Sequence, residues 1–421
     1  MLFDLQPKLK RKDLYDREKE LGEFEEALHL GERLILILGI RRLGKSSLLN
    51  VALSESSHPY AKLDVRSLYF THGSIPQEIL ARRILSSLID SLPPSGKLRL
   101  GITKALSSIR GIRLSGIHVE FEKKPDLAEI LEKVNSWAEN EGKRVIMAFD
   151  EAQYLRLSGI QYDGLVAYAV DNLPNLTFVL TGSEVGMLHD FLGLDNPKKP
   201  LFGRYAREIT LERFSREQSV DFLKSGFKEL GVNVSLPELE RAVDRLDGIV
   251  GWLSMYGYLR GIRRLPERDA LNELFHRAQA LVIDELSSLL SYSRRYGLIL
   301  KAVAMGNKTW SDIKEYLEFK AGRINDAKFS LLLKNLVKYG YLDKTTEGYL
   351  IPDPVVAEVI KETQLTPGSV TYGGGGPCTQ VGHCPHSVNR RHRMNVESDS
   401  TLQLHPPVRN PWEHLRLGYI P

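Results

Sequence analysis

The chain has 421 residues, of which 42% are hydrophobic, 26% charged and 8% aromatic. This composition is typical of a soluble protein with two or three domains. Lysine and arginine together outnumber aspartate and glutamate by only 57 to 53, so no chain-wide basic surface points to nucleic acid. The only cysteines, Cys378 and Cys384, exclude a disulfide framework.

Neither the longest apolar run nor the first residues indicate a membrane. The run from Leu34 to Ile40 is far shorter than the roughly 20 residues that a membrane helix needs. The N-terminal residues MLFDLQPKLKRKD carry charges throughout and have no apolar core, unlike a signal peptide. We therefore predict a cytoplasmic protein with no membrane partner.

Residues 1–211 alternate short apolar runs with helical stretches, which is the pattern of a parallel sheet flanked by helices. This pattern predicts an α/β domain. The expected strands are 33–38, 60–65, 144–150, 176–181 and 206–211.

Two further zones follow. Residues 212–292 contain only helical patterns, so we expect an all-α region. Residues 293–363 contain three helical patterns, the third with apolar side chains at helical spacing from Phe329 to Val337. The segment from Tyr341 to Ile351 then predicts a hairpin.

The last segment, 364–421, differs from the rest because it contains no lysine and shows no sustained period. We interpret it as a disordered or non-native extension. It contains Cys378, His383, Cys384 and His386, but their C-x4-H-C-x-H spacing matches no structural zinc pattern. A chance cluster is the favoured interpretation.

The strongest motif is G-x-x-x-x-G-K-S, which predicts a phosphate-binding loop (P-loop). It follows the apolar run Leu34–Leu38 and precedes a helical run that starts at Ser47, which is the context that the motif requires. Backbone N–H groups and the helix N-terminus would bind phosphates, Lys45 would neutralise them, and the Ser46 hydroxyl would hold Mg²⁺. The residues expected to bind nucleotide are Gly39, Ile40, Arg41, Arg42, Leu43, Gly44, Lys45, Ser46 and Ser47.

A pair of carboxylates supports this site. Asp150 and Glu151 end the apolar run that starts at Val145, and ligands gather at the carboxyl ends of parallel strands. We expect Asp150 to bind Mg²⁺ and Glu151 to act as base for an attacking water.

Other polar residues leave two interpretations open. Ser183 could orient the water or the γ-phosphate, or cap a helix. Arg204 could contact the γ-phosphate, or be a surface arginine. Arg41 and Arg42 could rim the site, or face another domain.

Together these motifs resemble the archaeal ATPase family, in the STAND branch of AAA+-like P-loop NTPases. The features that carry the resemblance, over about residues 10–360, are Asp16-Arg17-Glu18, GIRRLGKS, FDEAQ ending at Gln153, LFGR ending at Arg204, LERFS from Leu211 and DGIVGW ending at Trp252. The resemblance implies a P-loop domain, a helical lid and a winged helix-turn-helix. It also implies that Arg17 lies near the adenine or ribose, and that Ser183 and Arg204 sense the γ-phosphate. Relatives often carry Gly-x-Pro in the lid where this chain has Gly248-Ile-Val250, and Val250 would pack on the base instead.

The charge of the predicted winged helix leaves its partner open. Residues 294–363 contain 12 basic and nine acidic side chains, only a mild excess for meeting DNA phosphates. Binding of double-stranded DNA through 309–350, binding of a protein partner and self-association all remain alternatives.

The hypothesis that combines these features is a switch that binds and hydrolyses ATP with Mg²⁺, and whose nucleotide state controls the lid and the winged helix. The alternatives are a non-enzymatic scaffold with bound nucleotide and an initiator-type DNA-binding ATPase.

Overall fold

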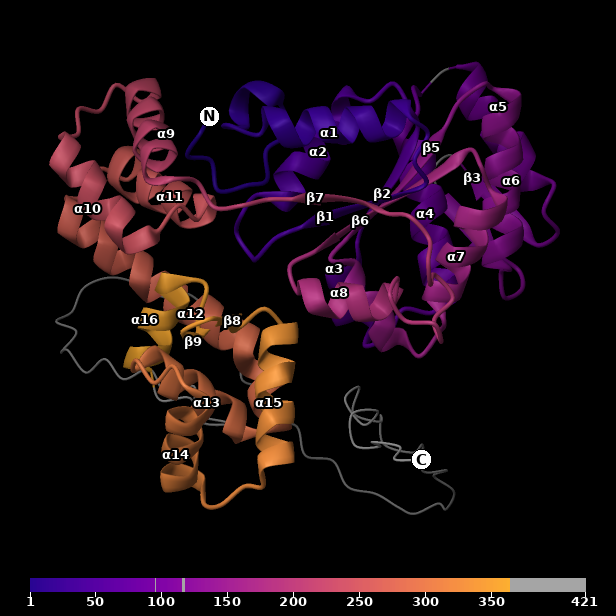
Figure 1. Ribbon diagram of the computed structural model, residues 1–421. Coiled ribbons are helices and arrows are strands. Elements are labelled where there is room, and N and C mark those ends of the chain that lie inside the picture. Colours follow the sequence, from indigo (N-terminus) through magenta and orange to yellow (C-terminus); the bar gives the residue numbers. More distant parts are fainter. Residues whose placement is uncertain (95, 116–117, 364–421) are drawn as a thin grey trace, which may run out of the picture. The chain divides into compact units, whose positions relative to one another are not determined.

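The computed structural model describes residues 1–363 except 95, 116 and 117 (Figure 1). These residues belong to one compact unit, Met1–Leu365. The predicted extension 364–421, with Cys378, His383, Cys384 and His386, lies outside the described residues. Within the described part, no helix is both long and apolar enough to cross a membrane.

A five-stranded sheet forms the centre of the N-terminal region, and its strands lie in the order β2-β5-β6-β1-β7. All neighbouring strands pair in parallel. The strands are β1 (Leu34–Leu38), β2 (Tyr60–Asp64), β5 (Val145–Asp150), β6 (Leu176–Gly182) and β7 (Arg207–Thr210). The five expected strands agree with these bounds to within one residue at each end, so the predicted α/β class is confirmed.

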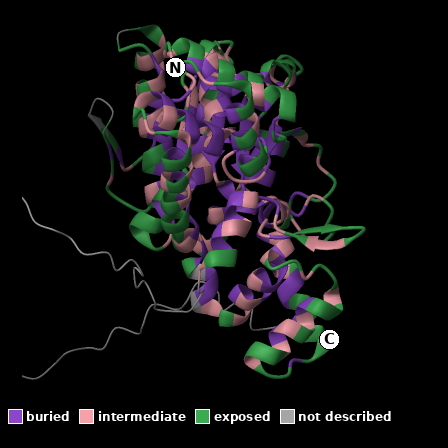
Figure 2. Ribbon diagram, turned by 90° about the vertical axis from the view of Figure 1, so that its left-hand side faces the viewer, coloured by how far each residue is buried: buried purple, intermediate pink, exposed green. Residues whose placement is uncertain are grey.

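Both faces of this sheet are covered. Every residue of β1 and β5 is buried. Leu34, Leu36 and Leu38 of β1 belong to one apolar core, and because side chains alternate along a strand, Ile35 and Ile37 face the opposite side. Buried residues, purple in Figure 2, fill the interior of the chain while the outer helix faces are exposed. A continuous apolar run is therefore the sequence of a central strand.

Helices connect and flank the strands. They are η1 (Arg11–Asp13), α1 (Glu18–His29), α2 (Lys45–Glu55), α3 (Val65–His72), α4 (Gln77–Ser91), α5 (Lys97–Ser107), α6 (Leu127–Asn140), η2 (Ala152–Ser158), α7 (Tyr162–Asn172) and α8 (Val185–Leu192). An antiparallel hairpin of β3 (Ile112–Ser115) and β4 (His118–Phe121) was not among the expected strands. Its strands have four residues each, too few for an alternating pattern to stand out.

The region that follows is entirely helical, as expected. Its elements are α9 (Arg216–Glu229), α10 (Leu236–Leu246), α11 (Val250–Gly257), the π-helical turn η3 (Tyr258–Ile262) and α12 (Glu267–Tyr292). Ser215 and Gln218 form a reciprocal capping box that starts α9. Pro237 lies in the first turn of α10, where its missing N–H costs no hydrogen bond.

Three helices and a hairpin then form the predicted winged helix. They are α13 (Arg294–Ala304), α14 (Trp310–Ala321), α15 (Asp326–Lys338), β8 (Asp343–Thr345) and β9 (Gly348–Leu350). Thr309 accepts a hydrogen bond from the backbone N–H of Asp312 and so starts α14.

A further helix, α16 (Pro354–Glu362), was not predicted. Its start signal is present in the sequence, since the Asp353 carboxylate accepts hydrogen bonds from the N–H groups of Val355 and Val356, and Pro354 opens the helix. We propose to divide the described chain after residues 211 and 292, because β7 ends at Thr210 and α12 ends at Tyr292.

Candidate nucleotide-binding site

The loop between β1 and α2 has the backbone of an anion cradle. Gly39 and Gly44 have φ angles of 139° and 92°, which favour glycine. A Cβ atom at Gly39 would also lie 2.7 Å from the carbonyl oxygen of Leu211. Because α2 starts at Lys45, with Gly44 as its N-cap, the free N–H groups of its first turn face the loop.

Lys45 is buried within this loop. Its Nζ donates hydrogen bonds of 2.8 Å to the carbonyl oxygens of Gly39 and Ile40. Burial lowers the pKa of Lys45 to about 8, although Glu151 and Asp150 oppose the shift. Carboxylate and carbonyl oxygens of the described residues thus partly compensate the burial of this cation, and a phosphate would stabilise it further.

The acidic pair lies at the carboxyl end of β5. The hydroxyl of Thr181 on the neighbouring strand β6 donates to Asp150 and accepts the N–H of Glu151 at 3.0 Å. Glu151 has a positive φ of 56°, which turns the chain sharply after the strand. Because β6 lies between β5 and β1, Thr181 links the acidic pair to the strand that leads into the P-loop.

The carboxylate of Glu151 is held in a fixed position. Its Oε2 accepts hydrogen bonds of 2.6 Å from the Ser183 hydroxyl and from the Gln153 amide. Burial alone would raise the pKa of Glu151, but Lys45 and these two donors outweigh it and lower the pKa. Glu151 is therefore ionised at neutral pH and able to accept a proton.

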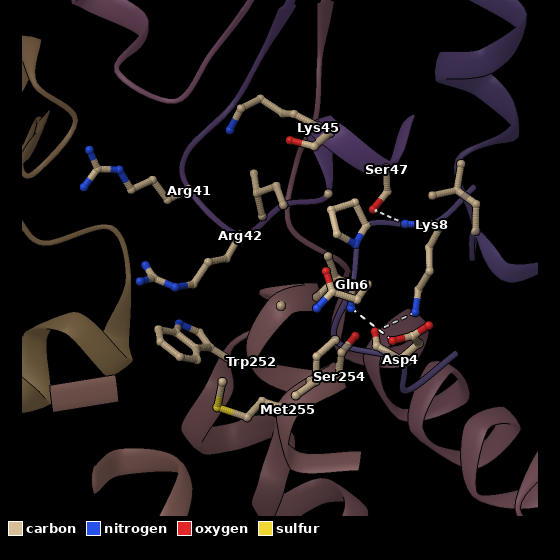
Figure 3. Close-up of a pocket in the computed structure, with 18 of the residues that line it drawn as sticks. Asp4, Gln6, Lys8, Arg41, Arg42, Lys45, Ser47, Trp252, Ser254 and Met255 are labelled. Atoms are coloured by element: carbon tan, nitrogen blue, oxygen red, sulfur yellow. Dashed lines mark hydrogen bonds between the residues drawn. The ribbon is translucent and has the colours of Figure 1, made fainter. Parts of the chain in front are cut away.

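The P-loop opens into a cavity of about 390 Å³, and Figure 3 shows some of the residues that line it. One end is polar and contains Lys45, Ser46 and Ser47, and the other is apolar and aromatic. The aromatic side chains are Tyr15, Phe214 and Phe222, which pack on one another, and Leu14 and Met255 also line the cavity. Val250 lies next to the P-loop, since a Cβ at Gly44 would be 3.6 Å from its side chain. A cavity of this size with a cationic end and an aromatic end fits a nucleotide, with phosphates on the loop and the base among the aromatic rings.

Arg17 joins the two ends of this cavity. Its guanidinium lies 4.8 Å from the centre of the Phe214 ring and donates to the carbonyl oxygen of Glu212 at 2.8 Å. It also bonds to Glu20 at 2.9 Å. Its donors are largely occupied by the protein, so it braces the base end of the cavity.

Comparison with known proteins decides the family. A model described as an ATPase domain predominantly from Archaea matches residues 14–256. This chain belongs to the archaeal ATPase family. A second model, the C-terminal winged helix-turn-helix domain of MCM proteins, matches residues 290–351.

Solved structures agree with this assignment. A Walker-type ATPase of Pyrococcus abyssi (paby2304) is 41% identical, covers 86% of this chain and all of its own, and superposes with a TM-score of 0.74. The ORC2 protein of Aeropyrum pernix, solved in ADPNP and ADP complexes, is 14% identical over 85% of this chain and 96% of its own, with a TM-score of 0.54. That likeness extends to the fold alone.

One curated relative also matches this member of the archaeal ATPase family. It is an uncharacterized protein of Methanocaldococcus jannaschii, 25% identical over 172 residues. The match spans 40% of this chain and about a third (34%) of the relative.

Most of the residues expected at the site lie together. Those that line the cavity are Arg17, Arg41, Arg42, Leu43, Gly44, Lys45, Ser46, Ser47, Glu151 and Val250. Gly39 and Ile40 supply the carbonyl groups that Lys45 contacts. Ser183 donates to the Glu151 carboxylate, and Asp150 is linked to the Glu151 N–H through the Thr181 hydroxyl.

Arg204 lies apart from the others. Its guanidinium forms two hydrogen bonds with the Asp171 carboxylate, at 2.9 and 2.6 Å, on the surface. It does not line the cavity described here, because Asp171 at the end of α7 fixes its orientation. Within the chain this arrangement is that of a surface arginine.

Several residues of the ATPase site were missed from the sequence. Thr181 bridges the acidic pair, Gln153 orients Glu151, and residues 4–8 form one wall of the cavity. Gln153 could have been predicted, because it follows the acidic pair by two residues, but no local pattern marks residues 4–8.

The Mg²⁺ site expected at Ser46 and Asp150 is chemically consistent. Both side chains supply oxygen ligands, which Mg²⁺ prefers, and the ion commonly takes its other ligands from phosphate and water. In the described part of the chain there is no group of three or more His, Cys, Asp or Glu that would hold a metal without a nucleotide.

Arg41 and Arg42 of the P-loop reach away from the sheet, toward the C-terminal region (Figure 3). Arg41 bonds to Glu184 at 2.6 Å, to Glu285 of α12 at 3.2 Å and to the Tyr341 hydroxyl at 3.2 Å. Arg42 bonds to Glu285 at 2.6 Å. All these side chains are largely buried, so a P-loop of this ATPase is bonded directly to the helical region and the winged helix.

Proposed function

We propose that this archaeal ATPase is a switch that binds and hydrolyses ATP with Mg²⁺, and that its nucleotide state controls the helical lid and the winged helix. The observation that carries the proposal is the pair of P-loop arginines. Arg41 and Arg42 share Glu285 of α12, and Tyr341 donates to the carbonyl oxygen of that same residue at 3.0 Å. A change at the phosphates would therefore be transmitted from the P-loop to α12 and to the winged helix through these side chains.

A second contact fixes Arg42 on the C-terminal region. Its guanidinium lies 4.3 Å from the centre of the Trp252 ring, and the Trp252 indole donates to Asp353 at 2.9 Å. Asp353 is the residue that caps α16. Arg42 thus stacks on a side chain that itself holds the start of the last helix.

ATP would compete for this cluster. Residues between Gly39 and Gly44 face the terminal phosphates in a P-loop, so γ-phosphate oxygens would attract Arg41 away from Glu184 and Glu285. Loss of the γ-phosphate would return Arg41 to its carboxylates. Two arrangements that differ in which acceptor Arg41 bonds constitute a switch.

The hydrolysis step is assigned to Glu151. Its ionised carboxylate would accept a proton from water as the water oxygen bonds to the γ-phosphorus, and the bond from that phosphorus to the β–γ bridging oxygen breaks, leaving ADP. Ser183 and Gln153 hold Glu151 in place, and Lys45 faces the phosphates. Mg²⁺, held by Ser46 and Asp150, would supply charge neutralisation at the phosphates.

The test is Mg²⁺-dependent ATP turnover by the full chain, with Glu151→Gln as the variant. Loss of a general base typically costs roughly 10²- to 10⁴-fold in rate, and ATP affinity should be retained. Turnover that survives in the variant would remove Glu151 from its assigned role. Absence of turnover in the wild-type chain, with nucleotide that co-purifies, would favour the scaffold alternative.

We further propose double-stranded DNA as the partner of the winged helix. The first half of α15 exposes Lys328, Ser330 and Leu331, and Lys334 follows on the same exposed side. In helix-turn-helix proteins the start of this helix contacts base edges. The end of α15 is instead engaged with α8 through Lys338 and Asp190.

Binding of duplex DNA by the full chain at increasing salt would test this partner. Each lysine that contacts a phosphate adds about one unit to the slope of log affinity on log salt. Lys328→Ala with Lys334→Ala should reduce the slope, and Lys104→Ala, at an exposed site on α5, should not. No salt-dependent binding would leave a protein partner or self-association.

A further inference from the structure

A segment at the start of the described chain is anchored in the helical region by the Phe3 side chain and by a hydrogen bond of 2.9 Å from the Leu2 N–H to Glu229 of α9. Phe3 is fully buried, and its ring lies edge-on to Phe222 and Phe227, at centroid distances of 5.8 and 5.0 Å. It fits between α9 and α11 because Gly226 and Gly257 leave space. A Cβ at either glycine would lie 2.3 Å from the ring of Phe3.

The other end of this segment is bonded to the P-loop helix. The N–H of Lys8 donates to the Ser47 hydroxyl at 3.0 Å, in the first turn of α2. The Lys8 ammonium closes the segment on itself, with bonds to the carbonyl oxygens of Leu2 at 2.9 Å and Asp4 at 2.7 Å. Residues 2–8, called the strap below, thus connect the helical lid to the helix that carries the phosphate site.

Between its two anchors the strap forms a wall of the nucleotide cavity. Residues 4–8 all line the cavity, which Tyr15 and Val250 line as well. Figure 3 shows the Gln6 side chain directed away from Asp4 and Lys8, toward the side of the cavity where Arg42 lies. The Gln6 side chain is exposed, and within the described residues no hydrogen bond to its side-chain amide is found.

We propose that the strap covers the base end of the cavity and that the Gln6 amide is the group that recognises the base. The inference rests on the proposed nucleotide site. A carboxamide offers one donor and one acceptor side by side, which matches the donor and acceptor edge of adenine. Because both anchors must hold for the strap to stay closed, the strap also slows nucleotide release.

The first test compares ATP with inorganic tripolyphosphate, which lacks a base, by equilibrium binding to the full chain. Gln6→Ala should weaken ATP roughly three- to tenfold, which is the worth of one or two net hydrogen bonds. It should leave tripolyphosphate affinity unchanged. Gln6→Glu should shift preference from ATP toward GTP, since a carboxylate only accepts and guanine offers two adjacent donors. Leu9→Ala, at a 66% exposed position outside the strap, is the matched control.

Each result has one meaning. Unchanged ATP affinity in both Gln6 variants, with binding still strongly weakened by Lys45→Ala, overturns the role of Gln6 and leaves the proposed function standing. Failure of the wild-type chain to bind ATP and tripolyphosphate overturns the proposed function and this inference with it.

The second test weakens the anchor of the strap at Phe3 and leaves residues 4–8, which line the cavity, unchanged. Gly226→Ala keeps a helix-compatible backbone but places a Cβ against the Phe3 ring, so it should speed ATP dissociation about tenfold or more, because an unanchored segment must be ordered again on binding. Phe3→Ala should do the same, and adding Gly226→Ala to Phe3→Ala should have no further effect. Wild-type dissociation rates in Gly226→Ala and in Phe3→Ala would contradict the strap.

Discussion

The two ends of the nucleotide cavity are built differently. The phosphate end consists of one continuous segment, residues 39–47, together with Asp150 and Glu151 at the end of β5, which β6 separates from β1. The proposed base end is assembled from separate segments, namely the strap, Tyr15, Phe214 and Val250. The phosphate-binding motif is therefore a local property of the sequence, whereas the proposed base end depends on how distant segments pack.

The largest effect is expected at the phosphate end. Lys45→Ala should weaken both ATP and tripolyphosphate by about 100-fold, since two charge-assisted bonds are each worth roughly 1.5 kcal/mol. Isothermal titration of the full chain would measure this. If the variant no longer bound ATP but still bound tripolyphosphate, Lys45 would not be a phosphate-binding residue.

A change at the base end should separate the same two ligands. Tyr15→Ala removes an aromatic ring that packs on Phe214 and Phe222 in the cavity. Loss of such contacts costs about 1–1.5 kcal/mol, so ATP should bind roughly tenfold more weakly while tripolyphosphate is unaffected. Equal weakening of both ligands would mean that the aromatic end does not hold the base. Thermal unfolding of the variant provides the control for stability.

The pH dependence of binding should reflect the buried lysine. The pKa of Lys45 is about 8, lowered by burial, and phosphate favours its protonated form. ATP affinity should therefore be constant below pH 8 and fall above it, by up to about tenfold per pH unit. Lys45→Arg keeps its charge throughout this range, so it should show no such fall. An identical profile in both proteins would assign the dependence to another group.

The smallest effect is expected at the arginine cluster. Arg41→Ala and Glu285→Gln each remove part of a shared set of contacts, so their effects on unfolding free energy should not add. A coupling of about 1 kcal/mol is typical of residues in contact. A double-mutant cycle by urea unfolding measures it, with Arg113→Ala, at an exposed ion pair of the β3–β4 hairpin, as an uncoupled control. Strictly additive changes in unfolding free energy would show that Arg41 and Glu285 do not interact.

The sequence predicted local features of the fold and the site, but not the contacts between distant segments. The strands and the P-loop were predictable because apolar runs and glycine spacing act over a few residues, as in Leu34–Leu38 and Gly39–Ser46. The sequence left open where Arg41 and Arg42 point, since the Glu285 partner of Arg42 lies 243 residues further along the chain. Phe3 did not stand out in the sequence, because its place depends on Gly226 of α9 and Gly257 of α11, more than 200 residues further along the chain.

Arg204 illustrates the opposite case, in which a motif residue lies outside the site. Its position in Leu-Phe-Gly-Arg204 suggested a contact with the γ-phosphate, but its guanidinium bonds to Asp171. A sequence motif specifies a residue type at a position and does not specify which of the surrounding carboxylates that residue will meet.

The central claim is that the nucleotide state reaches the winged helix through Arg41. Hydrogen–deuterium exchange of residues 339–353 in the full-length Glu151→Gln variant tests it most directly, with ATP, with ADP and without nucleotide. We expect faster exchange of this segment with ATP than with ADP, because the γ-phosphate would draw Arg41 away from Glu285 and from the Tyr341 hydroxyl. We also expect Arg41→Ala to remove the difference. Equal exchange in all three states, with ATP bound, would contradict the account.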